Sequence, residues 1–98
     1  MHLAKVIGSI VATQKSNSLT GKKLMLLRMI SFNDTGEETH WGAAEIAVDL
    51  VGAGQGETVL IARGSPVRHL FPEPNHVIDA VIVGIVDSIE RSLPERNQ

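Results

Sequence analysis

The sequence contains no cysteine and no tyrosine, and its aromatic residues are limited to Phe32, Trp41 and Phe71 among 98 residues. Without cysteine, disulfides and thiolate metal sites are excluded, and a reducing compartment such as the cytoplasm is indicated. The scarcity of aromatics disfavours a surface that stacks on bases or sugars. No two histidines have metal-ligand spacing, so we expect surface side chains rather than ligands at His2, His40, His69 and His76. Neither a metal nor a cofactor is predicted.

Charge and hydropathy argue against a nucleic-acid or membrane partner. The formal net charge is −2 and the isoelectric point is about 6.0, so the chain has no strongly basic footprint. The longest apolar run extends from Ala80 to Val86, far short of the ~20 residues of a membrane span. A modest basic cluster does surround the first long loop, at Lys15, Lys22, Lys23 and Arg28. This cluster keeps open the alternative of a protein that binds single-stranded nucleic acid.

Alternating apolar residues and turn signals divide the chain into short strands. The pattern predicts strands over residues 3–13, 22–32, 43–51, 57–63 and 77–89. Ser65 is a good N-cap and Pro66 suits a first helical position, so a short helix is expected over 66–70 before Pro72 ends it. Five strands with one short helix before the last predict an all-β, five-stranded OB-like barrel. This domain would cover residues 1–89, followed by a polar tail over 90–98.

A turn with three glycines, Gly52, Gly54 and Gly56, separates two of the predicted strands. A dinucleotide-binding fingerprint would need glycine at its sixth position, where Glu57 stands, and a following helix. We therefore interpret the turn as structural. Asp49, just before it, is predicted to form an ion pair with Arg63 or Arg68. The sequence holds no Gly-x-Ser-x-Gly elbow or other catalytic constellation, so an enzyme is not expected.

The distribution of apolar side chains over the strand faces indicates self-association. Strand 22–32 is apolar on both faces, with Met25, Leu27 and Met29 opposite Leu24, Leu26 and Ile30. In the last strand Val81, Val83 and Ile85 lie opposite Ala80, Ile82 and Val86. One set can fill the barrel, whereas the other needs cover that the loop over 33–41 and the tail are too polar to supply. Leaving six such side chains in water would forgo about 1.5–3 kcal/mol each, comparable with the stability of a whole small domain.

Strand 43–51 is expected to alternate cleanly, as a strand of a small antiparallel barrel with one solvated face should. Glu45 and Asp49 are predicted to lie on its outer face. The residues predicted to point inward are Ala44, Ile46, Val48 and Leu50.

Several segments, in order, resemble one known family. They are residues 1–15, the Leu-Thr-Gly-Lys-Lys-Leu segment over 19–24, the glycine turn over 47–57, the Gly-Ser-Pro-Val-Arg segment over 64–68 and the apolar strand over 79–87. Together they look like the bacterial microcompartment vertex proteins, the EutN/CcmL family. The fourth segment departs from the family's Gly-Ser-Ser-Ala-Arg at Pro66 and Val67, and both changes are compatible with a helix start.

The resemblance implies a function that no single motif would suggest. Members of this family are OB-like barrels that assemble as homopentamers, occupy the vertices of polyhedral protein shells and neighbour hexameric shell proteins. It therefore implies a structural, non-enzymatic protein of a cytoplasmic microcompartment, with an opening segment closer to catabolic shells than to carboxysomes. The subunit contact or five-fold rim is expected at Asp49, Val51, Gly52, Ala53, Gly54, Gly56, Gly64, Ser65 and Arg68. A small-molecule-binding regulatory ring remains a second alternative beside the nucleic-acid binder.

Overall fold

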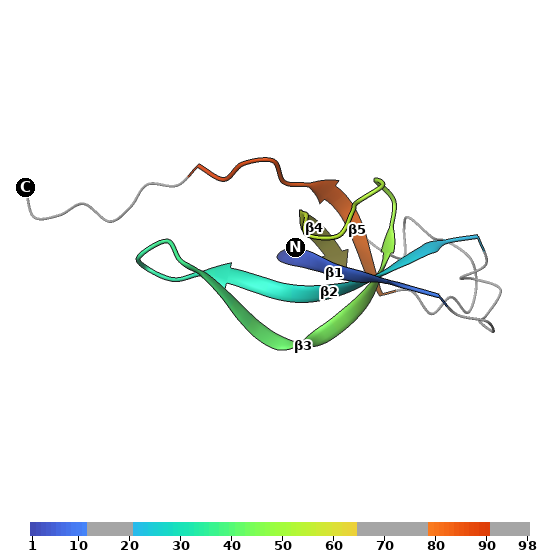
Figure 1. Ribbon diagram of the computed structural model, residues 1–98, viewed down its shortest axis with the longest axis horizontal. Helices are drawn as coiled ribbons and strands as arrows, with labels where there is room; N and C mark the ends of the chain where they lie inside the picture. Colours follow the sequence, from blue (N-terminus) through green and yellow to red (C-terminus); the bar gives the residue numbers. More distant parts are fainter. Residues whose placement is uncertain (12–20, 65–78, 91–98) are drawn as a thin grey trace, which may run out of the picture.

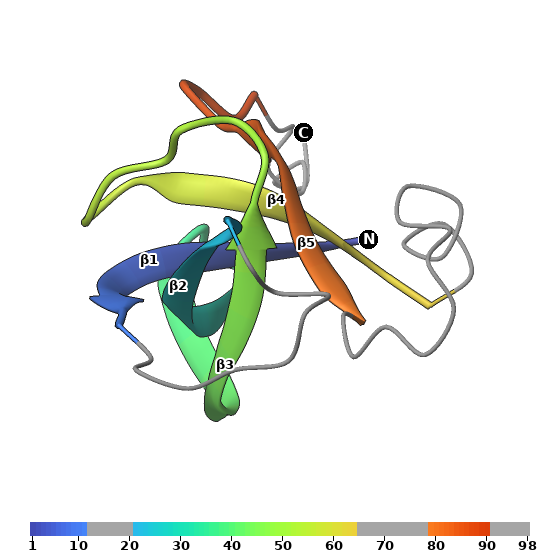
Figure 2. The same ribbon diagram turned by 90° about the vertical axis from the view of Figure 1, so that its right-hand side faces the viewer.

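The computed structural model describes residues 1–11, 21–64 and 79–90, which form a five-stranded closed barrel (Figure 1). The strands are β1 (His2–Ile10), β2 (Lys23–Phe32), β3 (Glu38–Asp49), β4 (Thr58–Arg63) and β5 (Ala80–Ile85). Their order around the barrel is β1-β2-β3-β5-β4, and only the β3–β5 pair is parallel (Figure 2). The predicted all-β OB-like barrel is thus confirmed. The helix predicted over 66–70 lies outside the described residues.

The strand boundaries differ most from the predicted ones in β3, which begins at Glu38 rather than at residue 43, and in β5, which ends at Ile85 rather than at residue 89. A short turn makes the earlier start possible. The side-chain oxygen of Asn33 accepts hydrogen bonds from the backbone amides of Thr35 and Glu37, at 3.1 and 2.9 Å. Such an Asx turn reverses the chain within a few residues, so the pairing of β2 with β3 begins directly beside the turn, at Phe32 and Glu38. β2 and β3 consequently form a long hairpin that projects beyond the barrel (Figure 1).

The interior of the barrel is filled by one face of each strand. Met25, Leu27 and Met29 of β2 point into it, as one of the two faces of this strand was expected to do. The other members of this core are Ala4, Val6, Ala47, Ala53, Val59, Ile61, Ala80 and Ile82. β5 has one extra residue, Val83, where its register with β4 shifts between Leu60 and Ile61. This bulge shifts the alternation of β5, so that Ile85 also packs against this core.

A second buried cluster lies on the outside of the barrel. It consists of Leu24, Val48, Ala62 and Val81, with Ile10 and Val83 packed against it. Leu24 and Val81 are already 8% and 0% exposed in the single chain. The expectation that the entire outer face of β2 and β5 needs cover from another molecule is therefore wrong, because part of that face is buried within the subunit.

The predicted facing of β3 is also wrong. Ala47 lies in the core because it pairs with Met25, whereas Ile46 and Leu50 are 53% and 49% exposed. Glu45 pairs with Leu27 and forms an ion pair with Arg63. The alternation of β3 is thus offset by one residue from the predicted phase. Within the described ranges, no helix is long and apolar enough to cross a membrane.

Candidate functional site

The turn after β3 is shaped by the carboxylate of Asp49, whose side chain has no exposed surface. One carboxylate oxygen accepts hydrogen bonds from the backbone amides of Val51 and Gly52 at 3.0 and 3.1 Å, and the other accepts from Ala53 at 2.8 Å. Three amides that no strand partner reaches are therefore satisfied by one side chain. These hydrogen bonds give the turn one defined backbone conformation.

Lys23 completes this arrangement from the neighbouring strand. It pairs with Asp49 in the β2–β3 register, its ammonium lies 3.5 Å from the Asp49 carboxylate, and it donates to the carbonyl of Ala53 at 3.3 Å. The predicted ion pair between Asp49 and Arg63 is wrong, because Arg63 pairs with Glu45 instead. The other predicted partner, Arg68, lies outside the described residues.

The second half of the turn is attached to β1. Gly56 donates to the carbonyl of Val6 at 2.8 Å, and the amide of Val6 donates to the carbonyl of Glu57 at 3.0 Å. The Glu57 carboxylate accepts the amide of Gly54 at 2.5 Å. The Glu57 carboxylate thus accepts the hydrogen bond from the Gly54 amide that a bound phosphate would need. This supports the interpretation of the turn as structural. Gly56 has a φ of 86°, a conformation that residues with a Cβ rarely adopt.

The nine residues predicted for the subunit contact fall into three groups. Asp49 and Ala53 face inward, since the carboxylate of the first and the whole of the second have 0% exposure. Residues that present the surface of the turn or of the strand end are Val51, Gly52, Gly54, Gly56 and Gly64. Ser65 and Arg68 lie outside the described residues.

Two functional contributors of the turn, Lys23 and Glu57, were not among the predicted residues. Lys23 reaches the turn through a cross-strand pairing, which the sequence alone does not show. The Asp-x-x-Gly spacing of Asp49 and Gly52 is a turn signal, and it could have identified the capping role of Asp49.

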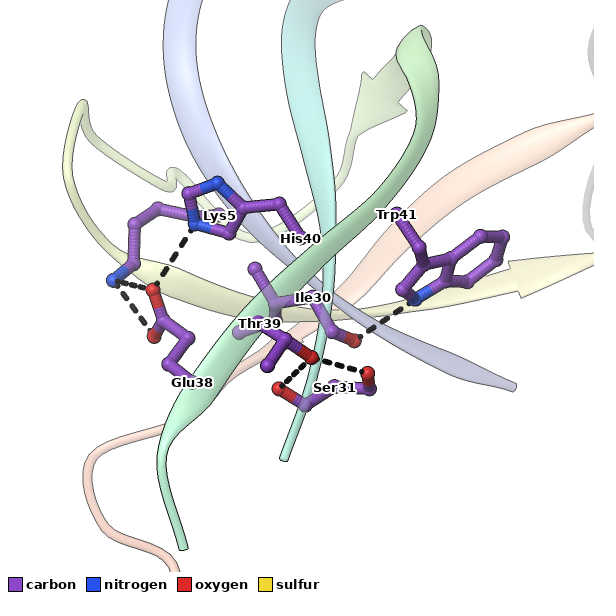
Figure 3. A network of polar contacts seen from close by, with 7 residues as sticks. All are labelled: Lys5, Ile30, Ser31, Glu38, Thr39, His40 and Trp41. Carbon is purple, nitrogen blue, oxygen red and sulfur yellow. Dashed lines mark hydrogen bonds and ion pairs between the residues drawn. The ribbon is translucent and has the colours of Figure 1, made fainter. Parts of the chain in front are cut away.

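A polar network lies at the end of the β2–β3 hairpin that is next to its turn (Figure 3). The ammonium of Lys5 on β1 contacts both Glu38 oxygens at 2.9 Å, and His40 lies 3.4 Å from the same carboxylate. Trp41 donates its indole N–H to the carbonyl of Ile30 at 3.3 Å. The hydroxyls of Ser31 and Thr39 are 2.9 Å apart on paired strands. The network joins three strands, and it holds no nucleophile next to a base.

Within the described residues, no group of three or more His, Asp or Glu side chains could hold a metal ion.

The hairpin network predicts a small dependence of stability on pH. The hydrogen bond from Lys5 lowers the pKa of the Glu38 carboxyl below its ordinary value, against the opposing effect of desolvation. The folded state therefore binds this proton less readily than the unfolded chain, so the stabilisation is present above the unfolded pKa of about 4.3 and is lost as pH falls through the folded pKa. The pair is partly exposed, and its contribution is at most about 1 kcal/mol.

This dependence is tested by comparing the wild type with Glu38→Gln in thermal melts at pH 7 and pH 3. The variant should melt at a lower temperature at pH 7, and the difference should be smaller at pH 3. Asp34→Asn, at the exposed tip of the same hairpin, serves as the control for a lost carboxylate. An unchanged difference at the two pH values would contradict the role given to the Lys5–Glu38 pair.

The site therefore combines a rigid turn and a structural polar network, and comparison with known proteins supplies its context. The family model described as "Ethanolamine utilisation protein EutN/carboxysome" matches residues 1–87. The chain belongs to the EutN/CcmL family. It is 52% identical to the bacterial microcompartment shell vertex protein PduN of Salmonella typhimurium, over 91% of this chain and 98% of that protein.

Solved structures of EutN/CcmL relatives share the fold. The pentameric microcompartment shell protein GrpN from Rhodospirillum rubrum matches with a TM-score of 0.76 and 40% identity, covering 94% of this chain and 100% of that one. The ethanolamine utilisation protein EutN from Escherichia coli matches with a TM-score of 0.74 and 34% identity, covering 95% and 92%. The resemblance seen in the sequence is thus confirmed. As a member of the EutN/CcmL family, the chain is a structural shell vertex protein and not an enzyme.

Proposed function

We propose that five copies of this chain close into a ring that caps a vertex of a bacterial microcompartment shell in the cytoplasm, next to hexameric shell proteins. The observation that carries the proposal is the similarity to PduN across nearly the full length of both chains. We also propose that this microcompartment is a catabolic one rather than a carboxysome. The identity to PduN is 52%, against 40% to the carboxysome protein CcmL of Thermosynechococcus vestitus, and this difference supports the proposal. The barrel supplies a rigid block from which such a ring can be built.

The glycine turn is the proposed rim or subunit contact of this ring. A closed ring uses heterologous contacts, in which two different surfaces of each subunit meet. The turn offers exposed backbone at Gly52 and Gly56, where small residues permit close approach by a neighbour. Asp49 serves the contact from inside the subunit by fixing the shape of the turn. Gly64, Ser65 and Arg68 are proposed to contribute from the segment after β4.

Native mass spectrometry tests the ring directly. We expect a species with five times the mass of the 10.6 kDa chain, stable at micromolar concentration. A chain that stays monomeric would contradict the proposal, and oligonucleotide binding by that monomer would favour the alternative of a single-strand-binding protein. The vertex role is tested by co-expression with hexameric shell proteins. Closed polyhedral shells should form with this chain present, and open or extended assemblies should form without it.

A further inference from the structure

An apolar patch remains open on the outer face of the sheet formed by β1, β2 and β3. Leu26 points outward because its neighbours Met25 and Leu27 point into the core, and it pairs with Ile46 of β3. On its other side a bulge places Ile7 and Gly8 together opposite Leu26. Ile46 is 53% exposed and Ile7 is 37% exposed. The pairing therefore puts three large apolar side chains in one row across three strands.

This row continues past the end of β3. Leu50 has the same facing as Ile46 and Val48, and it is 49% exposed; Val51, which begins the glycine turn, is 40% exposed. We call Ile7, Leu26, Ile46, Leu50 and Val51 the β3 outer patch. Along β3, Val48 lies between Ile46 and Leu50 but is buried in the outer cluster of the chain. The patch is thus the open continuation of an apolar surface that the subunit itself covers only in part.

We infer that the neighbouring copy in the ring covers the β3 outer patch, and that the subunit contact extends from the glycine turn along the outer face of β3. The inference rests on the proposed ring. A second copy is the occupant that fits, because a relative with the same fold and 40% identity is pentameric, and because the patch adjoins the turn that the ring is proposed to use. Gly8 and Ala44 flank the large side chains and leave room for a close approach.

The patch is bordered by charge on the side of the hairpin. Lys5 pairs with Arg28 in the β1–β2 register, and Lys5 is bound to Glu38. Polar residues thus rim the apolar row at that end. An apolar centre with a polar rim is the composition expected of a protein interface. Loss of a central apolar anchor is usually the most damaging single change in such a surface.

The first test places a charge in the patch. Ile46→Glu should raise the protein concentration at which the ring half dissociates by about 30-fold or more, while the monomer keeps its far-ultraviolet circular dichroism. Ile89→Glu is the matched control, since Ile89 is 46% exposed and lines a pocket with Phe32 and Gly36 at the turn of the β2–β3 hairpin, outside the β3 outer patch. This variant should remain pentameric by native mass spectrometry.

The second test uses the absence of native cysteine and does not depend on a charged variant that folds. Single cysteines are introduced as Ile46→Cys and Ile89→Cys, and their reaction with a maleimide is followed in the assembled protein. The cysteine at position 46 should react at least about tenfold more slowly than the one at position 89, although both sites are half exposed in the single chain.

Failure of this inference is distinguishable from failure of the ring. A wild type that is monomeric overturns the ring and the inference with it. A pentameric wild type whose Ile46→Glu variant assembles equally well, or whose cysteine at position 46 reacts as fast as that at position 89, overturns the inference alone.

Discussion

Replacing Asp49 with alanine is expected to lower the free energy of unfolding by about 3 kcal/mol, because it leaves three turn amides without an acceptor and Lys23 without its carboxylate partner. Each lost acceptor would be partly replaced by water, but Ala53 is fully buried and its amide has little access to solvent. In a chain of this size, such a loss lowers the melting temperature by more than about 10 °C. The measurement is a thermal melt at one fixed protein concentration, since assembly adds to apparent stability.

Two variants separate the capping role of Asp49 from its ion pair. Lys23→Gln removes the charge partner but leaves the three amide hydrogen bonds, so the loss should stay below about 1 kcal/mol for a side chain that is half exposed. Asp49→Asn retains one oxygen for Val51 and Gly52 but turns an amide group toward Ala53, and it should give an intermediate loss. Equal losses for Lys23→Gln and Asp49→Ala would show that the ion pair, rather than the capping, stabilises the turn.

The sequence was sufficient to predict the number of strands and their approximate positions along the chain. Period-two alternation and turn residues are local signals, and each strand carried them independently. The order of the segments also identified the family. The start of β3 was placed too late because the Asn33 turn is short, and its hydrogen bonds to Thr35 and Glu37 depend on geometry within the turn.

The facing of β3 could not be predicted because alternation fixes which residues share a face but not which face is buried. The charges of Glu45 and Asp49 favour the outer surface for both residues. In the structure the carboxylate of Asp49 accepts hydrogen bonds from backbone amides, and that of Glu45 forms an ion pair with Arg63. Both carboxylates therefore have partners on the inner side of the strand. Ile46 then lies outward, although it is apolar. The same lack of cross-strand information made Arg63 appear to be the partner of Asp49.

The site was recoverable from the sequence only in part. The turn was located correctly as a structural element, but the side chains that maintain it were assigned by proximity along the chain. Lys23 is far from Asp49 in sequence and directly opposite it in the sheet. The apolar surface that a neighbour could cover was predicted on β2 and β5, and the structure moves most of it to β3. Partial burial of the outer face by the chain itself is a tertiary property that no strand pattern reports.

A pair of adjacent leucines on β2 tests the inside and outside of the barrel most sharply. Leu27 is 0% exposed in the core, whereas Leu26 faces outward in the β3 outer patch. Leu27→Ala should lower the free energy of unfolding by about 3–5 kcal/mol, since it removes buried methyl groups and leaves a cavity among close-packed neighbours. For a small domain with a total stability of about 5–15 kcal/mol, this is a large fraction.

Leu26→Ala makes the same chemical change one residue away and should act on the assembly instead. Its effect on the free energy of unfolding of the single chain should stay below about 1.5 kcal/mol, because the side chain is only partly buried and its loss leaves no enclosed cavity. Urea unfolding followed by circular dichroism measures the first effect, and native mass spectrometry over a dilution series measures the second. If Leu26→Ala destabilised the fold as much as Leu27→Ala, the assigned phase of β2 would be wrong. The outward orientation assigned to Ile46, which pairs with Leu26, would then also be wrong.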